Sequence, residues 1–267
     1  MDTAELAELF GTSSPVIGML HLRPLPGSPD AEDLPSVRQR LLQDAQALFD
    51  GGVDGFILEN FGDAPYYPNR VHPQTVAYMT LIGQEVRDAF PKPLGINVLR
   101  NDALSALAIA TAVGAQFIRV NVYMGARVAD EGLIQGEAHR VVRYRRELGS
   151  DVRIFADVAV KHSTPLGAMD LKDEVRDTIL RGKADAIVVS GSATGSETSI
   201  ADLKVAKEVA AGVPVLAGSG VTVGNVAETL AHADGIIVGT GFKVDWVTTN
   251  PVDPARVREL LRIARTS

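Results

Sequence analysis

Two stretches near the C-terminus decide the fold: Pro214-Val-Leu-Ala-Gly-Ser-Gly-Val-Thr222 and Gly235-Ile-Ile-Val-Gly-Thr-Gly-Phe242. In each of them a short apolar run breaks into closely spaced glycines. Val215–Ala217 and Ile236–Val238 are predicted to be buried strands, because they are too short for helices and are bounded by turn-forming residues. The glycines that follow permit tight turns, in which main-chain N–H groups can approach an anion.

Two consecutive strand–turn units at the end of a chain of 267 residues resemble the phosphate site that follows strands seven and eight of a TIM barrel. The turns therefore predict a phosphate site built from main-chain amides, with a loop hydroxyl after the sixth strand as a further donor. The predicted phosphate-binding residues are Gly218, Ser219, Gly220, Gly239, Thr240 and Thr194. The alternative is that the glycines serve only the turn geometry, and that Thr194 caps its own loop.

The composition narrows the class of protein. The chain is 46% hydrophobic, enough for a large core, and it has no cysteine, which excludes disulfides and thiolate metal sites. The formal net charge of -7, without basic runs, argues against nucleic acid and anionic membranes as partners. The acidic, polar start fits no targeting peptide, and no apolar run is long enough to be embedded in a membrane. We expect a cytoplasmic protein that forms a homo-oligomer.

Strand-like and helix-like segments alternate along the chain. The apolar runs predict strands at residues 15–22, 55–60, 94–99, 116–122, 153–160, 186–189, 215–217 and 236–238. Amphipathic patterns predict helices between them, and a closing helix at 254–265. Eight such units in this length predict an α/β fold, a single (β/α)8 TIM barrel over residues 1–267, with 1–13 as an N-terminal extension. A doubly wound open sheet is the alternative, but it rarely needs eight units.

Polar residues recur on one face of the predicted strands. In 153–160 the β-branched residues alternate with Asp157, so the apolar face should pack on helices while Asp157 and Lys161 point into the barrel. The same reasoning assigns an inward direction to His21, Glu59, Asn97, Arg119 and Asn121. Because barrel active sites lie at the C-terminal ends of the strands, this set predicts the active site. A structural ion pair between Arg119 and one of the carboxylates is the alternative for those residues.

These side chains suggest roles. Glu59 and Asp157 would share general acid–base work, since neighbouring inward carboxylates push their pKa values apart. Asn97 and Asn121 would orient hydroxyl groups of a ligand, and His21 and His162 are reserve acid–base groups.

Lys161 has two possible roles. Burial disfavours its charge and nearby Asp157 favours it. We expect a charged Lys161 that stabilises a developing oxyanion, with Schiff-base chemistry as the alternative.

Metal and cofactor signals are weak. Asp130 and Glu131, in the loop after the fourth strand, could ligate a divalent cation, although such acids are more often solvated. No other metal site and no organic cofactor is predicted.

Five motifs carry a resemblance to a known family: residues 16–29 (VIGMLHLRPLPGSP), 59–66 (ENFGDAPY), 130–136 (DEGLIQG), 157–162 (DVAVKH) and 218–222 (GSGVT). From about residue 13 to the C-terminus the chain resembles the BtpA/SgcQ family. The resemblance implies a TIM barrel of the ribulose-phosphate-binding type. The family takes its name from photosystem I biogenesis, but members also occur in organisms without a photosystem.

The site and the resemblance together predict an enzyme that acts on a phosphorylated sugar or a phosphoribosyl or nucleoside-type small molecule. The expected reaction is an isomerisation, a lyase reaction or the cleavage of a glycosidic bond. The opposing hypothesis is a non-catalytic barrel that binds a ligand or assists the assembly of a membrane complex.

Overall fold

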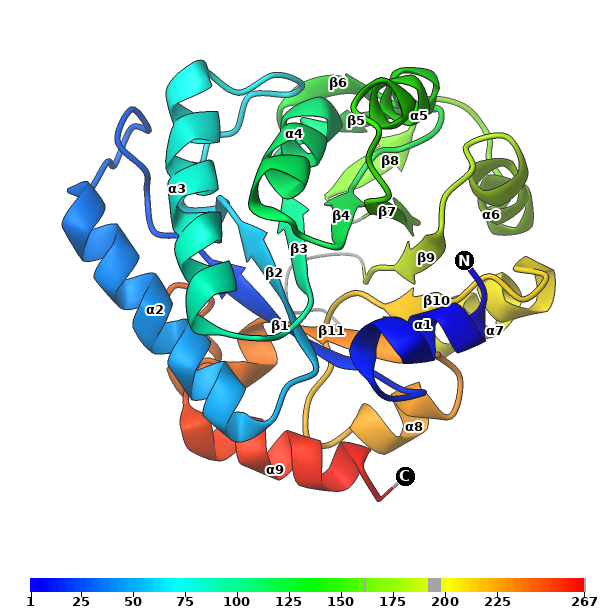
Figure 1. The fold of residues 1–267 in the computed structure, drawn as a ribbon. Helices are drawn as coiled ribbons and strands as arrows, with labels where there is room; N and C mark the ends of the chain where they lie inside the picture. The colour runs from blue at the N-terminus through cyan, green and yellow to red at the C-terminus, as the bar shows by residue number, and fades with distance from the viewer. Residues whose placement is uncertain (161, 192–197, 267) are drawn as a thin grey trace.

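The computed structural model describes residues 1–160, 162–191 and 198–266 of the chain, and its centre is a closed barrel of eight parallel strands (Figure 1). Around the barrel the strands follow one another in the order β1, β11, β10, β9, β7, β4, β3, β2. Their bounds are β1 (Val16–His21), β2 (Gly55–Glu59), β3 (Leu94–Asn97), β4 (Phe117–Val120), β7 (Arg153–Val158), β9 (Ala186–Val189), β10 (Val215–Ala217) and β11 (Gly235–Val238). Each of the eight predicted strands is present, so the TIM barrel is confirmed.

Helices cover the outside of the barrel between successive strands (Figure 1). They are α2 (Leu34–Gly51), α3 (Pro73–Ala89), α4 (Ala103–Val113), α5 (Ala138–Glu147), α6 (Leu171–Leu180), α7 (Ile200–Val209), α8 (Val226–Leu230) and α9 (Pro254–Ala264). Local sequence fixes several of their ends. Asp102 caps α4 by accepting from the N–H of Ser105, and Gly114 ends the same helix in the left-handed conformation (φ 65°).

The barrel has two apolar layers. The outward layer packs against the helices and includes Ile118, Ile154 and Val158, as the alternation of the strands predicts. The inward layer fills the barrel axis, with Phe117 and Phe155 stacked at 4.5 Å between ring centroids. The inward layer is completed by Ile17, Met19, Ile57, Ala186, Val188, Leu216 and Ile237.

The N-terminal end of the barrel is closed by a helix that the sequence analysis did not predict, α1 (Thr3–Phe10). A reciprocal capping box between Asp2 and Glu5 starts this helix. Its buried residues, Leu6 and Phe10, join the inward layer of the barrel. The segment expected to be a mere extension therefore seals one end of the core.

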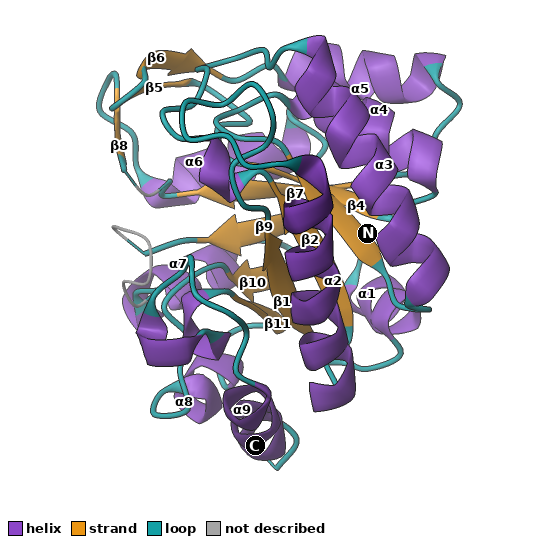
Figure 2. Cartoon of the chain, turned by 90° about the vertical axis from the view of Figure 1, so that its left-hand side faces the viewer, coloured by secondary structure: helices purple, strands orange, loops and turns teal. Residues whose placement is uncertain are grey.

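A second small sheet, also unpredicted, lies at the other end of the molecule from α1 (Figure 2). It consists of β5 (Ala126–Ala129), β6 (Gly132–Gln135) and β8 (Ser163–Pro165), all antiparallel. The segment between β4 and α5 was predicted to be a loop. Gly132 instead makes a tight turn (φ 100°), and Ile134 packs on Val122 and Val160 to form a satellite core.

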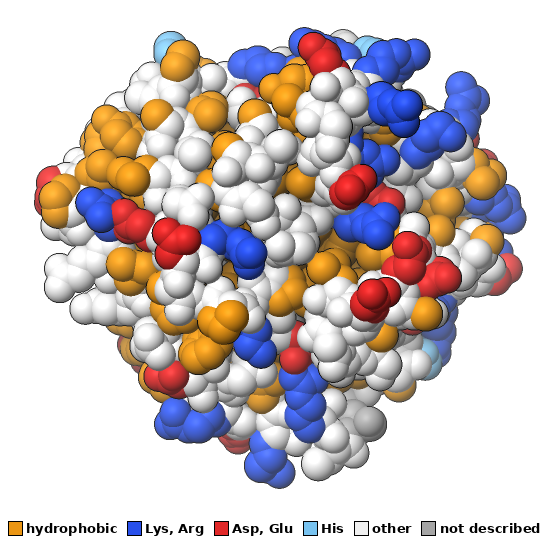
Figure 3. All heavy atoms as spheres, viewed as in Figure 1, with side chains coloured by type: hydrophobic (Ala, Val, Ile, Leu, Met, Phe, Trp, Pro, Cys, Tyr) orange, Lys and Arg blue, Asp and Glu red, His pale blue; other side chains and the backbone are white. Residues whose placement is uncertain are grey.

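Among the described residues there are also three short 3-10 helices: η1 (Phe61–Asp63), η2 (Thr240–Phe242) and η3 (Val244–Trp246). On the face seen in Figure 3 acidic and basic side chains are interspersed, and Lys and Arg gather where Figure 1 places α5. That helix carries Arg140, Arg143, Arg145 and Arg146. The negative net charge is thus not spread evenly over this face.

Within the described ranges no helix combines the length and apolarity that a membrane crossing requires.

Candidate active site at the C-terminal end of the barrel

A cavity of about 380 Å³ opens at the C-terminal ends of the strands, within the size range of ligand pockets, roughly 300–1,000 Å³. Barrel strands contribute His21, Glu59 and Arg119 to its wall. The two glycine turns, at 218–222 and 239–241, form another part of the wall. The motif that decides the fold and three of the inward polar residues, His21, Glu59 and Arg119, therefore share one cavity.

The first functional group of this cavity is a carboxylate–imidazole pair. Strand register places His21 of β1 directly opposite Glu59 of β2, and Glu59 opposite Asn97 of β3. Asn97 Nδ2 donates a hydrogen bond to Glu59 Oε2, and His21 Nε2 lies 3.8 Å from Glu59 Oε1. A carboxylate fixed by an amide and beside an imidazole can accept and deliver protons in a ligand bound in the cavity.

The His21 ring is held by two neighbours. Phe61 of η1 packs on it with the ring centroids 4.9 Å apart. The backbone of Gly239 also lies close to the ring: a Cβ atom there would lie 2.8 Å from His21 Cε1, so any other residue would displace the ring. The glycine turn thus shapes the acid–base pair as well as the anion site.

Asp157 is committed to a different network. Arg119 donates to both of its carboxylate oxygens, at 2.8 and 2.9 Å, Asn121 donates at 3.0 Å and Ser190 at 3.2 Å. Burial opposes the charge of Arg119, but the neighbouring carboxylate outweighs it and raises the pKa of the guanidinium. Arg119 is therefore a fixed cation at the cavity, and the structural ion pair given above as the alternative is present, with Asp157 as the partner. Both carboxylate oxygens of Asp157 are thus engaged by hydrogen bonds within the protein.

One polar atom beside this network, Asn121 Oδ1, is left open by the residues that the structure describes. Asn121 is 2% exposed, and its Oδ1 has no hydrogen-bond partner within the described ranges. Its amide therefore orients Asp157 through Nδ2, while Oδ1 keeps its capacity to accept a hydrogen bond.

The glycine turns offer main-chain donors, with one correction to the predicted set. The Gly218 N–H donates to the Val189 carbonyl at 2.8 Å and so cannot bind an anion. Gly218 matters through its missing side chain, because a Cβ atom there would lie 3.1 Å from Arg119 Nη2. The N–H groups of Gly220, Gly239, Thr240 and Gly241 have no acceptor in the part of the chain that the structure describes. These four donors border the cavity.

Ser219 and Thr240 contribute hydroxyl groups to the same wall. Ser219 Oγ accepts from the Gly191 N–H at 2.7 Å, and Thr240 Oγ1 lies 2.8 Å from Thr248 Oγ1. Both hydroxyls are thus oriented by neighbouring loops. An anion here would be surrounded by amides and hydroxyls rather than by flexible cations.

Some of the predicted site residues do not line the cavity, among them Asn97, Asn121 and Asp157. Lys161 and Thr194 lie outside the described residues. His162 is exposed in the turn before β8 and does not line the cavity. Glu131 lies 3.5 Å from Arg100, and the described residues contain no cluster of three or more His, Asp or Glu side chains that could hold a metal ion.

Two aromatic residues of the cavity wall, Phe61 and Trp246, were missed from the sequence. Each follows a barrel strand at its C-terminal end, the position where loop residues build barrel sites. Trp246 is also the only tryptophan of the chain. The position of both residues after a strand, and for Trp246 also its rarity, could have indicated that they belong to the site.

Fold and cavity define a TIM barrel with a polar site at the C-terminal ends of its strands. The chain belongs to the BtpA family, whose model matches residues 12–266. It is 50% identical over 254 residues to the photosystem I biogenesis protein BtpA of Synechocystis sp., covering 95% of this chain and 88% of that protein. It is 36% identical to the putative sgc region protein SgcQ of Escherichia coli, covering 96% of each chain.

Solved structures of other barrels match at low sequence identity. Tryptophan synthase of Mycobacterium tuberculosis superposes with a TM-score of 0.63 and 18% identity, covering 97% of this chain and 98% of that one. A structure described as native KDPGal gives a TM-score of 0.59 at 17% identity, covering 96% of both chains. Phosphoribosylanthranilate isomerase of Pyrococcus furiosus gives 0.58 at 14%, covering 95% of this chain and all of that one. These likenesses establish the fold alone.

Proposed function

We propose that this protein is an enzyme that moves a proton within a phosphorylated sugar or a phosphoribosyl compound. One observation carries the proposal: a single cavity combines the open amides of two glycine turns with the Glu59–His21 pair. The amides would anchor a phosphate group at one side of the cavity. The pair would then face the carbon skeleton of the ligand.

Arg119 supports the binding of an anion. It lines the cavity and keeps its positive charge through Asp157. A Cβ atom at Gly218 would lie 3.1 Å from both Arg119 Nη2 and Ser190 Oγ, which places the cation beside the first glycine turn. A phosphate would therefore meet main-chain donors and a fixed cation together, and both favour its negative charge.

The arrangement favours isomerisation or lyase chemistry over glycosidic-bond cleavage. Glycosidases generally use two free carboxyl groups that flank the scissile bond. Here Asp157 is occupied by four donor contacts, which leaves Glu59 as the carboxylate of the pair. Glu59 would take a proton from a hydroxyl-bearing carbon next to a carbonyl group, and protonated His21 would give a proton to the carbonyl oxygen, so that an enediol forms.

A second candidate function rests on sequence similarity. The Synechocystis relative, which is 50% identical to this chain, is named as a photosystem I biogenesis protein. Under this alternative the barrel would bind a phosphorylated ligand without turning it over and would assist the assembly of a membrane complex. The same cavity would then bind the ligand as a signal for assembly and would not catalyse a reaction.

A ligand and turnover panel separates the two functions. Ketose phosphates, aldose phosphates and phosphoribosyl compounds are screened for thermal stabilisation and for conversion to product. For a substrate found this way, Glu59→Gln should lower kcat about 10²- to 10⁴-fold, the usual contribution of general acid–base catalysis, while the ligand still stabilises the fold. Stabilisation without turnover of any compound, unchanged by Glu59→Gln, would favour the binding role.

The matched control is Glu208→Gln. Glu208 lies on α7 and pairs with Lys172 on the protein surface, with 62% of its side chain exposed. It undergoes the same chemical change far from the cavity, so kcat should stay at the wild-type value. An equal loss of activity in both variants would contradict the role of Glu59.

A further inference from the structure

The loop after η2 presents an exposed aromatic ring to the cavity. Trp246, in η3, lines the cavity although 60% of its surface is exposed. Large aromatic side chains are usually buried, and an exposed one beside a polar pocket points to recognition. The acid–base pair and the phosphate anchor of the proposed function leave this ring without a role.

One face of the Trp246 ring packs against a charged side chain. The guanidinium of Arg256 lies 3.6 Å from the centroid of the Trp246 ring and so covers one of its faces. Arg256 is itself oriented by Asp253, at 3.4 Å. With one face covered and most of the residue still exposed, the remaining ring surface is available to a ligand.

The backbone of this loop is strained. Asp245 and Trp246 have φ angles of 55° and 54°, in the left-handed region that residues other than glycine seldom adopt. Such strain persists only where surrounding contacts enforce it, and it concentrates at functional sites. Lys243, just before the strained pair, supplies those contacts: its buried ammonium bonds to Asp44 at 2.7 Å, and its carbonyl accepts from the Trp246 N–H at 3.2 Å.

We infer that Trp246 is a stacking platform for a planar ring carried by the ligand. The inference rests on the proposed function, because it assumes that the glycine turns hold a phosphate in the same cavity. It narrows the substrate class to phosphoribosyl compounds that bear an aromatic base or a comparable planar group. A plain sugar phosphate would satisfy the amides and the Glu59–His21 pair but would leave the face of Trp246 opposite Arg256 without a ligand contact.

The single tryptophan makes the inference directly measurable, because intrinsic tryptophan fluorescence reports Trp246 alone. The probes are inorganic phosphate, ribose 5-phosphate, adenosine 5′-monophosphate and uridine 5′-monophosphate. Each is titrated into the full chain while fluorescence and, by calorimetry, the Kd are measured. Stacking of a base on an aromatic side chain typically contributes about 1–3 kcal/mol, so at least one nucleotide should bind about 5-fold to 150-fold more tightly than ribose 5-phosphate. The same nucleotide should quench the fluorescence.

Two variants test the role of the ring. Trp246→Ala should weaken nucleotide binding to the level of ribose 5-phosphate, and should leave the Kd of ribose 5-phosphate unchanged. Trp246→Tyr keeps an aromatic face and should retain most of the gain. The melting temperature of each variant shows whether it is folded. An equal loss for both ligands in Trp246→Ala would overturn the inference, because the residue would then act by shaping the phosphate turn.

The outcomes also separate this inference from the proposed function. If ribose 5-phosphate and phosphate bind but the bases add no affinity and no quenching, the platform is wrong and the phosphate anchor stands. If none of the four probes binds, both the phosphate anchor and the platform are overturned.

Discussion

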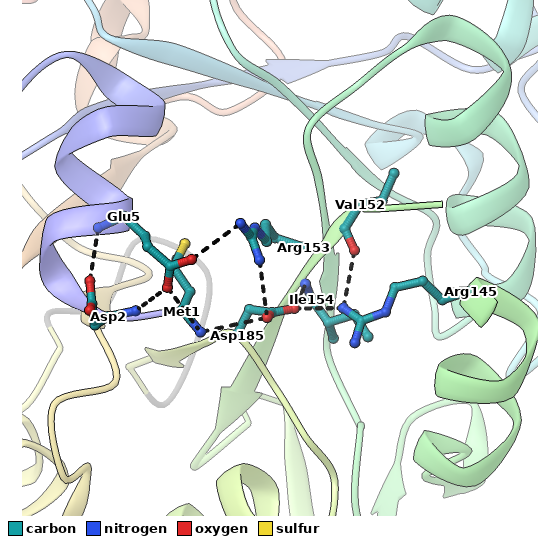
Figure 4. Close-up of polar contacts among 8 residues, drawn as sticks. All are labelled: Met1, Asp2, Glu5, Arg145, Val152, Arg153, Ile154 and Asp185. Atoms are coloured by element: carbon teal, nitrogen blue, oxygen red, sulfur yellow. Dashed lines mark hydrogen bonds and ion pairs between the residues drawn. The ribbon is translucent and has the colours of Figure 1, made fainter. Parts of the chain in front are cut away.

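The two ends of the barrel use similar residues to opposite effect. At the N-terminal end Asp185 accepts from the Ile154 N–H at 2.8 Å and from Arg145 at 2.7 Å, and it lies 3.7 Å from the Met1 ammonium group (Figure 4). Charges there face one another, and α1 seals the axis with apolar side chains. At the C-terminal end, open amides, the Glu59–His21 pair and Trp246 face a cavity instead.

The difference shows how one barrel divides its tasks. Polar groups that satisfy one another lock α1 and the strand starts together, whereas polar groups left open toward a cavity are available to a ligand. This division is typical of the fold, in which the N-terminal face serves stability and the C-terminal face carries the site. Arg119 belongs to both groups, because it lines the cavity and also forms a buried ion pair with Asp157.

The largest expected effect on stability comes from a variant that tests this double role of Arg119. Arg119→Met removes the cation and leaves the Asp157 carboxylate buried with only neutral donors. Breaking a buried ion pair from one side typically costs about 3–5 kcal/mol, so the free energy of unfolding should fall by that amount. Denaturant titration of the variant measures it. A loss below about 1 kcal/mol, the usual range of surface pairs, would mean that this network does not stabilise the barrel.

Two further variants sharpen this result. Arg153→Met, at the N-terminal end, removes a guanidinium that is 40% exposed and should cost no more than about 1 kcal/mol. Adding Asp157→Leu to Arg119→Met removes the uncompensated carboxylate and should recover part of the lost stability.

The next effect belongs to the closed end. Leu6 of α1 is fully buried in the barrel axis, and Leu6→Ala should destabilise the protein by about 2–5 kcal/mol, the range for truncated core leucines. Ligand affinity at a temperature where the variant is folded should not change, since α1 closes the end of the barrel opposite the cavity and Leu6 does not line it. Leu9→Ala, on the same helix but only partly buried, is the matched control and should cost less. A change in ligand affinity with Leu6→Ala would show that the two ends are coupled.

The sequence predicted the barrel well because its strands carry a strong pattern. Alternation separates Ile154 from Phe155 regardless of tertiary context, and eight repeats of that pattern leave few alternatives. The polar residues His21, Glu59 and Asn97 were recognisable because each interrupts an apolar strand near its C-terminal end. Register then aligns them in one row.

What the sequence could not show is which polar group partners which. Asp157 and Glu59 look equivalent as inward acids, yet the Arg119 guanidinium saturates only the first. The Gly218 amide looked as open as that of Gly220, and only the ladder with β9 shows that it is occupied. The sequence did not indicate the short helix α1, because its first turn is polar. The burial of Leu6 and Phe10 also depends on the barrel that this helix closes.

The smallest expected effect concerns the loop that borders the site. Asp63, at the end of η1, accepts from the Leu25 N–H at 2.8 Å and from Asn60 at 3.1 Å. It thereby ties the proline-rich loop between β1 and α2 (residues 22–33) to the loop that carries Phe61. Burial raises the pKa of Asp63 above its usual range, even though both hydrogen bonds favour the charged form. The C-terminal end thus holds a carboxyl group whose ionisation the fold disfavours.

The pH dependence follows from the sign of that shift. At pH values below the ordinary aspartate pKa, about 3.9, both folded and unfolded chains hold the proton. As the pH rises, the unfolded chain releases it first, so the folded state loses stability relative to the unfolded state until the pH has passed the raised pKa. The unfolding free energy of the wild type minus that of Asp63→Asn should therefore decrease from about pH 4 toward neutrality and then level off. Asp30→Asn, at an exposed position of the same proline-rich loop, controls for the change in net charge. If the difference rises with pH instead, the carboxylate of Asp63 stabilises the loop in its charged form, and the C-terminal end would resemble the closed end in the way it satisfies its charges.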